Sequence, residues 1–456
     1  MKIIIIGAGI SGCAVYLLLK KHLPAEDHHS YIIYEAYDTS QKSFQERTAE
    51  DTHSATLVVG GGIGLAPNGL NVLRRLDEDL FHDVVRSGYP YSRFKLKSSF
   101  GWTLQEIDAR GGDADHPIES VSMSRHALWS CLKNRVPTDA FICKKVKWVT
   151  VNPNGRHVVH FADDSPPEEA DLVIGADGLK SVVKKALFCS DPSSEDPYPP
   201  HYEGLVGVGG FFPVAEDMRR TITPKCMTIA FGGQGFFGYS YSSPTGANYY
   251  LSSPPPSPDA LLWWSTYFTP TCPDHKSIDS DSVTAQLRAR HASWPDPVVQ
   301  RIIGSARVES MYPIWTTPEL PVWDREGVIL LGDAAHALPP NSGQGSSQAL
   351  EDAEALALFL AHHLRAPQTD SAEQRGISER EAVKLATKQY TDLRFPRVHA
   401  VGQEAKRMKQ REAGIGLLTE LIISFFIWVM GLFSSGPQKQ LYNYNIAEEV
   451  ESVLSK

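Results

Sequence analysis

Three glycines near the N-terminus have the spacing of a phosphate-binding turn. Gly7, Gly9 and Gly12 follow the order G-x-G-x-x-G, directly after an apolar run and before a stretch with helical spacing of its apolar residues. In a strand–turn–helix unit such glycines permit a tight turn and let the backbone approach a pyrophosphate at the helix N-terminus. Glu35 ends the next β-rich run, where a carboxylate can accept hydrogen bonds from an adenosine ribose. These residues predict a dinucleotide site, without separating FAD from NAD.

Two later apolar runs also end in glycine and aspartate. Asp177 stands in G-A-D-G, and Asp333 stands in a G-D pair that opens a long stretch rich in glycine and proline. That stretch leads into a helix expected from about residue 346 to residue 363. Its further binding candidates are Gly343, Gly345 and Ser346.

These motifs together resemble those of the group A flavoprotein monooxygenases, the para-hydroxybenzoate-hydroxylase-like family, over about residues 1–363. The resemblance implies non-covalent FAD, NADH or NADPH as a transient electron donor, and O₂ as a co-substrate. It implies that Asp333 contacts the ribityl chain of the flavin, while Asp177 belongs to a segment associated with both FAD and the nicotinamide. The helix after Asp333 then directs its positive end at the reduced ring.

The resemblance adds four further positions. Gly60 and Gly61 fall in a glycine-rich segment similar to the one that covers the flavin in this family. Arg125, at the start of an expected helix, becomes the arginine that reaches the FAD phosphates, although such a residue by itself is usually solvated. Lys184 replaces the arginine that usually ends the Asp177 motif, so a contact with phosphate would lack bidentate geometry. The resemblance assigns no catalytic arginine to this chain, because the chain reads G-V-G-G-F at the place where some members of the family carry that arginine.

The elements that must position these residues indicate an α/β fold. We expect a Rossmann-like FAD-binding domain with a parallel sheet, an inserted antiparallel β-sheet domain for the substrate, and a C-terminal helical segment. The expected FAD-binding domain is interleaved, from segments 1–90, 120–190 and 320–365. The substrate-binding sheet domain takes 91–119 and 191–319, and the helical region takes 375–456.

The length, composition, charge and cysteine content of the chain limit the class of protein to which it can belong. Its 456 residues are 42% hydrophobic and 21% charged, as in an ordinary globular protein of two to three domains. A net charge of −9 with scattered basic residues argues against a nucleic-acid partner. Six separated cysteines give neither a metal site nor a disulfide scaffold, so we expect no metal and a reducing, cytoplasmic location.

The sequence predicts an enzyme that hydroxylates or epoxidises a small, largely apolar organic substrate, in secondary-metabolite biosynthesis of the fungal type. Aromatic segments 236–241 and 263–267 are the expected substrate-facing material. Tyr239 and Tyr241 are the pocket candidates, and we expect at most one of them to face the pocket; the catalytic residues stay unknown. Two alternatives remain, a non-oxygenating FAD oxidase or reductase and a non-catalytic binding module on the same fold. A halogenase is disfavoured because no W-x-W-x-I-P motif occurs.

Residues 417–433 are strongly apolar and follow a basic stretch. The uninterrupted part is shorter than the roughly 20 residues that a bilayer span needs. We favour a helix packed against the fold, with peripheral membrane contact as the main alternative and a single span as the least favoured one.

Overall fold

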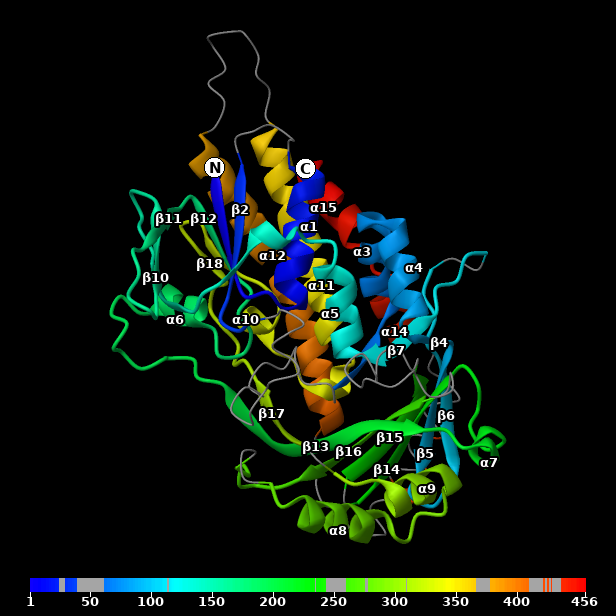
Figure 1. Cartoon of the computed structure of the whole chain (residues 1–456). Helices are drawn as coiled ribbons and strands as arrows, with labels where there is room; N and C mark the ends of the chain where they lie inside the picture. The colour runs from blue at the N-terminus through cyan, green and yellow to red at the C-terminus, as the bar shows by residue number, and fades with distance from the viewer. Residues whose placement is uncertain are drawn as a thin grey trace.

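Figure 1 shows two layers of structure, a helix-covered parallel sheet at one end and a large second sheet at the other. In the computed structural model, the described residues are 1–23, 29–38, 61–112, 115–233, 235–242, 260–274, 278–308, 310–365, 378–409, 421–422, 425, 428 and 436–456.

The first sheet has six strands in the order β18-β19-β12-β1-β2-β8. Its strands are β1 (Lys2–Ile6), β2 (Ser30–Glu35), β8 (Phe141–Cys143), β12 (Leu172–Gly175), β18 (Asp324–Arg325) and β19 (Val328–Leu330). All pairs are parallel except β18 with β19. The apolar run of β1 is buried on both faces, as expected for a central strand of a parallel sheet.

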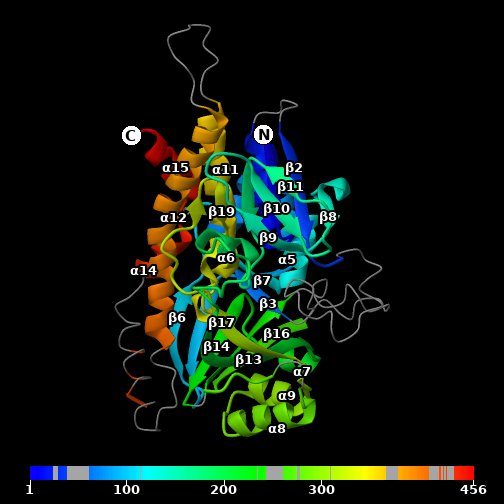
Figure 2. The same ribbon diagram turned by 90° about the vertical axis from the view of Figure 1, so that its left-hand side faces the viewer.

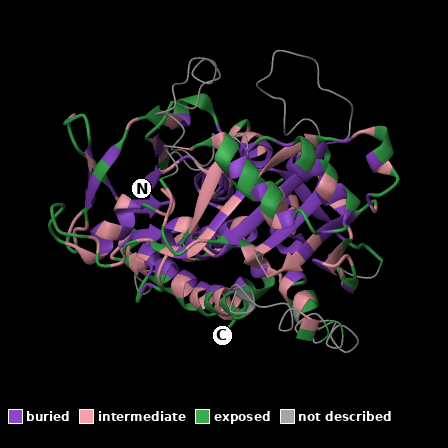
Figure 3. Cartoon of the chain, turned by 90° about the horizontal axis from the view of Figure 1, so that it is seen from below, coloured by how far each residue is buried: buried purple, intermediate pink, exposed green. Residues whose placement is uncertain are grey.

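Helices surround this sheet, some packed on its strands and others on one another. They are α1 (Ile10–His22), α3 (Pro67–Leu76), α4 (Glu78–Arg86), α5 (Arg125–Lys133), α6 (Val182–Phe188), α10 (Asp333–His336), α11 (Gly345–Leu364) and α12 (Glu379–Lys409). The long α11 packs between α1 and α12, and fourteen of its residues are buried, including both Glu351 and Asp352. Burial colours show the central strands inside and the outward faces of the helices exposed (Figure 3).

The second sheet has seven strands in the order β17-β13-β16-β15-β14-β5-β6. They are β5 (Arg93–Ser98), β6 (Thr103–Asp108), β13 (His201–Pro213), β14 (Cys226–Gly232), β15 (Gly235–Ser242), β16 (Ala260–Phe268) and β17 (Met311–Thr316). The sheet is antiparallel except where β14 pairs in parallel with β5. No hairpin joins those two strands, so their direction is not constrained by a turn. Helices α8 (Ser280–His291) and α9 (Pro297–Ser305) cover its outer face.

Two three-stranded sheets complete the fold. Their strands are β3 (Gly62–Leu65), β4 (Tyr89–Tyr91), β7 (Ser120–Ser124), β9 (Val146–Thr150), β10 (His157–Phe161) and β11 (Glu168–Ala170). The sheet β3-β7-β4 lies between the two large layers, and β7 packs on β15 and β16.

The C-terminal helices return to the body of the molecule (Figure 2). Helix α15 (Ile446–Leu454) buries Ile446 and Val450 in the main core, and α14 (Gly436–Tyr442) buries Tyr442 against Tyr91 and Met227. Within the described residues, no helix combines the length and apolarity that a membrane crossing would need. Most of 417–433 lies outside those residues. The predicted fold class, a Rossmann-like sheet with an inserted β-sheet and C-terminal helices, is confirmed.

Candidate active site

A single large cavity of about 2260 Å³ connects the carboxyl ends of the parallel strands with the inner face of the seven-stranded sheet. Sites for one small molecule commonly measure about 300–1,000 Å³. The cavity therefore has room for a dinucleotide and a second molecule. The sequence-predicted residues that line it are Gly7, Gly9, Glu35, Gly61, Arg125, Asp177, Asp333, Gly343, Gly345 and Ser346.

The three N-terminal glycines have different roles. Gly7 has φ +101°, and a Cβ there would lie 2.4 Å from the carbonyl oxygen of Ala176. A Cβ on Gly12 would lie 1.9 Å from the carbonyl oxygen of Gly7, so Gly12 serves the packing of α1 and does not line the cavity. Gly9 alone faces open space, at the N-terminus of α1. The turn thus places the N-terminus of α1, whose first backbone N–H groups have no acceptor within the helix, beside the cavity.

Glu35 ends β2 at the rim of the cavity. Its Oε2 accepts from the backbone N of Ala8 at 2.7 Å, and its Oε1 accepts from the backbone N of Tyr37 at 3.1 Å. Burial raises the pKa of Glu35 although these hydrogen bonds oppose the shift. The carboxylate is thereby fixed beside the phosphate-binding turn, with lone pairs left to accept from hydroxyl groups.

Asp177 both lines the cavity and caps a helix. Its Oδ1 accepts from Ser181 Oγ at 2.5 Å, and its Oδ2 accepts from the backbone N of Val182, the first residue of α6, at 2.8 Å. Burial raises the pKa of Asp177. Lys184 is not on the cavity: its side chain is fully buried, and its Nζ lies 3.0 Å from Asp196 Oδ2 and donates to the carbonyl of Tyr198. The structure therefore gives Lys184 a structural ion pair instead of a phosphate contact.

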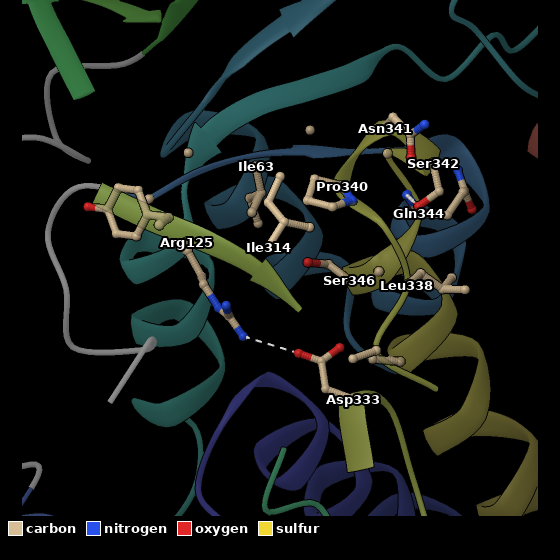
Figure 4. Close-up of a pocket in the computed structure, with 18 of the residues that line it drawn as sticks. Ile63, Arg125, Ile314, Asp333, Leu338, Pro340, Asn341, Ser342, Gln344 and Ser346 are labelled. Atoms are coloured by element: carbon tan, nitrogen blue, oxygen red, sulfur yellow. Dashed lines mark hydrogen bonds and ion pairs between the residues drawn. The ribbon is translucent and has the colours of Figure 1, made fainter. Parts of the chain in front are cut away.

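Arg125 and Asp333 approach each other across the cavity (Figure 4). The Arg125 Nη2 lies 3.8 Å from the Asp333 Oδ2, and both side chains are partly exposed. The Arg125 backbone N donates to the carbonyl of Gly61 at 2.8 Å, which ties the start of α5 to the glycine segment before β3. Ile63, Ile314 and Pro340 form an apolar edge beside the pair.

The stretch after Asp333 presents backbone and one buried amide to the cavity. Gly343 adopts φ +60° after a short 3-10 turn (Pro340–Ser342), and Gly345 begins α11. Gln344 is 1% exposed, and its Nε2 has no hydrogen-bond partner among the described residues. A buried donor of this kind is satisfied by an acceptor within reach, such as a water molecule or a bound ligand.

The glycines supply a direct test of whether FAD fits. A Cβ at Gly9, Gly61, Gly178, Gly343 or Gly345 would meet no atom within 4 Å. These positions follow the cavity from the N-terminus of α1 to the N-terminus of α11. Because backbone is exposed along the whole path and two helix N-termini end on it, the residues present fit an extended diphosphate cofactor.

Some expectations fail or fall outside the described structure. Gly60 lies outside the described residues. Tyr239 and Tyr241 are two residues apart on β15 and therefore share a face, which points away from the cavity, so neither pocket candidate lines it. Tyr239 donates from its hydroxyl to Asp296 Oδ2 at 3.3 Å, and Tyr241 packs on Tyr89, both on the side covered by the outer helices.

The apolar lobe of the cavity is made by residues that sequence reasoning did not single out. They come from β4, β5, β6, β14, β16 and α14: Tyr91, Phe94, Leu96, Leu104, Ile107, Met227, Ile229, Leu262, Leu441 and Tyr442. From the aromatic segments 236–241 and 263–267, Phe236 and Trp264 line the cavity, while Trp263 stacks on Phe237 away from it. The alternation of side chains along these strands shows that only some of the aromatic residues can line the cavity, but the sequence does not say which face of the strand is the inner one.

Comparisons with known proteins agree with this geometry. A family model described as an FAD binding domain matches residues 166–389. The chain is 26% identical to 6-hydroxynicotinate 3-monooxygenase of Bordetella bronchiseptica, over 88% of this chain and 89% of that protein. It is also 26% identical to the FAD-dependent monooxygenase sor5 of Hypocrea jecorina, over 100% of this chain and 94% of that protein.

Solved structures share the fold. The crystal structure of Klebsiella pneumoniae HpxO complexed with FAD and uric acid matches with a TM-score of 0.70 and 20% identity, covering 100% of this chain and 97% of that chain. A salicylate hydroxylase substrate complex matches with a TM-score of 0.69 and 19% identity, covering 99% and 97%. These findings confirm the expected resemblance: the chain carries an FAD binding domain and is an enzyme similar to the FAD-dependent monooxygenases along most of its length.

Proposed function

We propose that the protein uses NADPH or NADH and O₂ to hydroxylate or epoxidise an apolar organic molecule. In the balanced reaction, one oxygen atom of O₂ enters the substrate, the other leaves as water with a proton from solvent, and the nicotinamide is oxidised. The supporting observation is the continuous cavity, which joins the glycine-lined path to an apolar lobe. When bound, FAD accepts the hydride and activates oxygen.

The residues of this chain bind, orient and exclude water. We assign the pyrophosphate of FAD to the turn with Gly7 and Gly9 and its adenosine ribose to Glu35. The ribityl and ring end is assigned to Asp333 and to the stretch that contains the candidates Gly343, Gly345 and Ser346. Asp177 holds the N-terminus of α6 beside the cofactor path. Arg125, the positive side chain beside Asp333, is placed to balance phosphate charge.

The apolar lobe defines the proposed substrate. Strands β5 and β6, from segment 91–119, complete the sheet of segment 191–319, so we propose these two segments as the substrate-binding unit and segments 1–90, 120–190 and 320–365 as the FAD-binding unit. Helix α14 of the C-terminal region closes the lobe with Leu441 and Tyr442. A fused-ring secondary metabolite, such as a polyketide, terpenoid or alkaloid scaffold, suits a lobe lined in this way.

Two polar side chains that are hydrogen-bonded to each other line this lobe. The Tyr442 hydroxyl accepts from Gln438 Nε2 at 3.0 Å, and both side chains line the cavity. Burial raises the pKa of Tyr442 to about 12, so its hydroxyl keeps its proton at neutral pH and can donate to a substrate oxygen. We infer a substrate that is apolar over most of its surface and carries at least one acceptor oxygen.

The test measures NADPH and NADH oxidation by the FAD-loaded protein against a set of fused-ring compounds, followed by mass analysis of products formed under ¹⁸O₂. Substrate-accelerated oxidation and one labelled oxygen per product support the proposal. Stoichiometric hydrogen peroxide with an unlabelled oxidised product moves the protein to the oxidases, and no turnover with any compound and no flavin reduction favours the binding module. Leu441→Trp, which narrows the lobe, should abolish the substrate effect while FAD content stays unchanged.

We also propose that the enzyme is cytoplasmic and contacts a membrane surface. Ile422, Phe425 and Trp428 are each about half exposed, and the basic Lys406 and Arg407 precede them. Exposed large apolar side chains in a segment that follows basic residues in the sequence are typical of attachment to anionic lipid. Cosedimentation with phosphatidylserine vesicles that is lost in the triple serine variant at these three apolar positions supports the contact, whereas equal recovery of both proteins in the supernatant contradicts it.

A further inference from the structure

A fully buried arginine of α12 holds three side chains of α11. Arg394 Nε donates to Asp352 Oδ1 at 2.8 Å, and its Nη2 donates to Gln348 Oε1 at 2.6 Å. Its Nη1 donates to Glu351 Oε2, which also accepts from Arg397 Nε at 2.7 Å. Because each buried charge has an opposite partner and hydrogen bonds, the cluster avoids the cost of an unpaired buried ion.

The second oxygen of Asp352 faces the turn that carries Asp333. Asp352 Oδ2 accepts from the backbone N of Gly332 at 2.9 Å and from His336 Nε2 at 2.6 Å. Gly332 has φ +56° and directly precedes Asp333, while His336 ends the same short helix. One carboxylate therefore holds both ends of the α10 turn.

A second contact from α12 reaches the strand that leads into this turn. The hydroxyl of Tyr390, itself fully buried, donates to the carbonyl of Leu330, the last residue of β19, at 3.1 Å. Helix α12 thus contacts β19 directly through Tyr390 and contacts the turn through Arg394 and Asp352.

We propose that Asp352 is a positioning residue of the FAD site, which fixes Gly332 and His336 so that the Asp333 carboxylate faces the cavity. Arg394 holds Asp352 in place and so makes α12 part of the cofactor site, although Arg394 lies beyond the family match at residues 166–389. The inference rests on the proposed contact between Asp333 and FAD.

The same helix offers a matched control. Glu354, 1% exposed, accepts from Arg75 Nε at 2.8 Å and from Arg75 Nη2 at 2.6 Å. This partly buried pair joins α11 to α3, and neither residue lines the cavity. Glu354→Gln therefore breaks an ion pair of a buried α11 carboxylate without touching the α10 turn.

The experiment titrates the full-length apoprotein with FAD, following flavin fluorescence, and measures the Tm of each apoprotein. Asp352→Asn should weaken FAD binding about tenfold or more, the effect of losing hydrogen bonds to a charged group. Glu354→Gln should lower Tm and leave the Kd for FAD within about twofold of wild type. In an Asp333→Asn background, Asp352→Asn should add little further loss, because both changes remove the same contact.

The other possible outcomes distinguish a failure of the proposed role of Asp333 from a failure of the inferred role of Asp352. If Asp333→Asn binds FAD as wild type does, the assignment of Asp333 fails, and the inference fails with it. If Asp333→Asn weakens binding but Asp352→Asn only lowers Tm, or if the two losses add fully, Asp352 is merely structural.

Two substitutions at His336 decide the case if Asp352→Asn does not fold. His336→Gln keeps a donor for Asp352, whereas His336→Phe keeps the packing on Trp323 but loses that donor. The inference expects weak FAD binding in the phenylalanine variant and near-normal binding in the glutamine variant. Equal FAD affinity in both variants overturns it.

Discussion

Arg125 Nη2 lies 3.8 Å from Asp333 Oδ2, which brings together side chains from two motifs far apart in the sequence. The Arg125 and Asp333 side chains are 34% and 40% exposed, so their mutual attraction contributes little to folding stability. Both are free to exchange partners when a ligand enters. The pair therefore marks a place where a positive and a negative group face the same space, which suits phosphate and hydroxyl groups of one cofactor.

Arg125→Ala should weaken FAD binding more than it changes the folding of the protein. A charge-assisted hydrogen bond contributes about 1.5–3 kcal/mol, and partial exposure favours the lower end, about tenfold in Kd. The measurement is FAD titration of the apoprotein at low salt, with Tm as the control for folding. An unchanged Kd would show that Arg125 is only a solvated side chain.

Gly345→Val should block the cofactor path without unfolding the chain. A Cβ at Gly345 meets no protein atom within 4 Å, so the added side chain projects into the cavity. Overpacking of this kind costs about 1–3 kcal/mol, roughly five- to 150-fold in FAD affinity. Gly304→Val is the matched control, since Gly304 in α9 also faces open space but does not line the cavity. Equal loss of FAD in both variants would contradict the proposed path.

Sequence reasoning found what local patterns encode. The glycines, Glu35 and the aspartates that end strands sit at fixed offsets from apolar runs, so their places at the cavity follow from a few neighbouring residues. It missed Arg394, because an arginine in a long polar helix reads as a solvated residue until tertiary packing buries it. It also misplaced Tyr239 and Tyr241, since alternation defines two faces of a strand but not which face points inward.

The same limit applies to Lys184 and to the apolar lobe. Lys184 occupies a motif position at which the family uses an arginine. Its ammonium group nevertheless pairs with Asp196, which lies in a loop that carries no motif. Leu441 and Tyr442 reach the lobe from α14, near the C-terminus, and only the packing of that helix against β4 and β14 brings them there. Long-range contacts of this kind leave no signal in local spacing.

The stability supported by Asp352 should disappear at low pH. Burial alone would raise the pKa of Asp352, but His336 and Arg394 outweigh it and lower the pKa to about 2. A carboxyl group whose folded-state pKa lies below its unfolded value of about 3.9 stabilises the fold above that value. The contribution is lost as the pH falls towards about 2.

Denaturant unfolding of wild type and Asp352→Asn between pH 6 and pH 2 measures this contribution. The difference in free energy of unfolding should be constant near neutral pH and should shrink by on the order of 2–3 kcal/mol below about pH 4. Nearby Glu351, whose pKa is also lowered by Arg394 and Arg397 against its burial, is present in both proteins and titrates in both. A difference that does not change with pH would contradict the prediction.

Lys184→Met should destabilise the fold and leave FAD binding unchanged. The Lys184 side chain is fully buried, its Nζ lies 3.0 Å from Asp196 Oδ2, and it also donates to the carbonyl of Tyr198. Removing the buried ammonium leaves the carbonyl of Tyr198 without this donor and the Asp196 carboxylate, which is 23% exposed, without its partner, at a cost of about 1–3 kcal/mol. Lys180→Met is the control, because Lys180 is exposed and lines the cavity, so the same loss of charge there should leave Tm unchanged. If Lys184→Met weakens FAD binding tenfold while Tm stays as in wild type, Lys184 reaches the phosphates after all, and the ion pair with Asp196 is not its role in the FAD-bound protein.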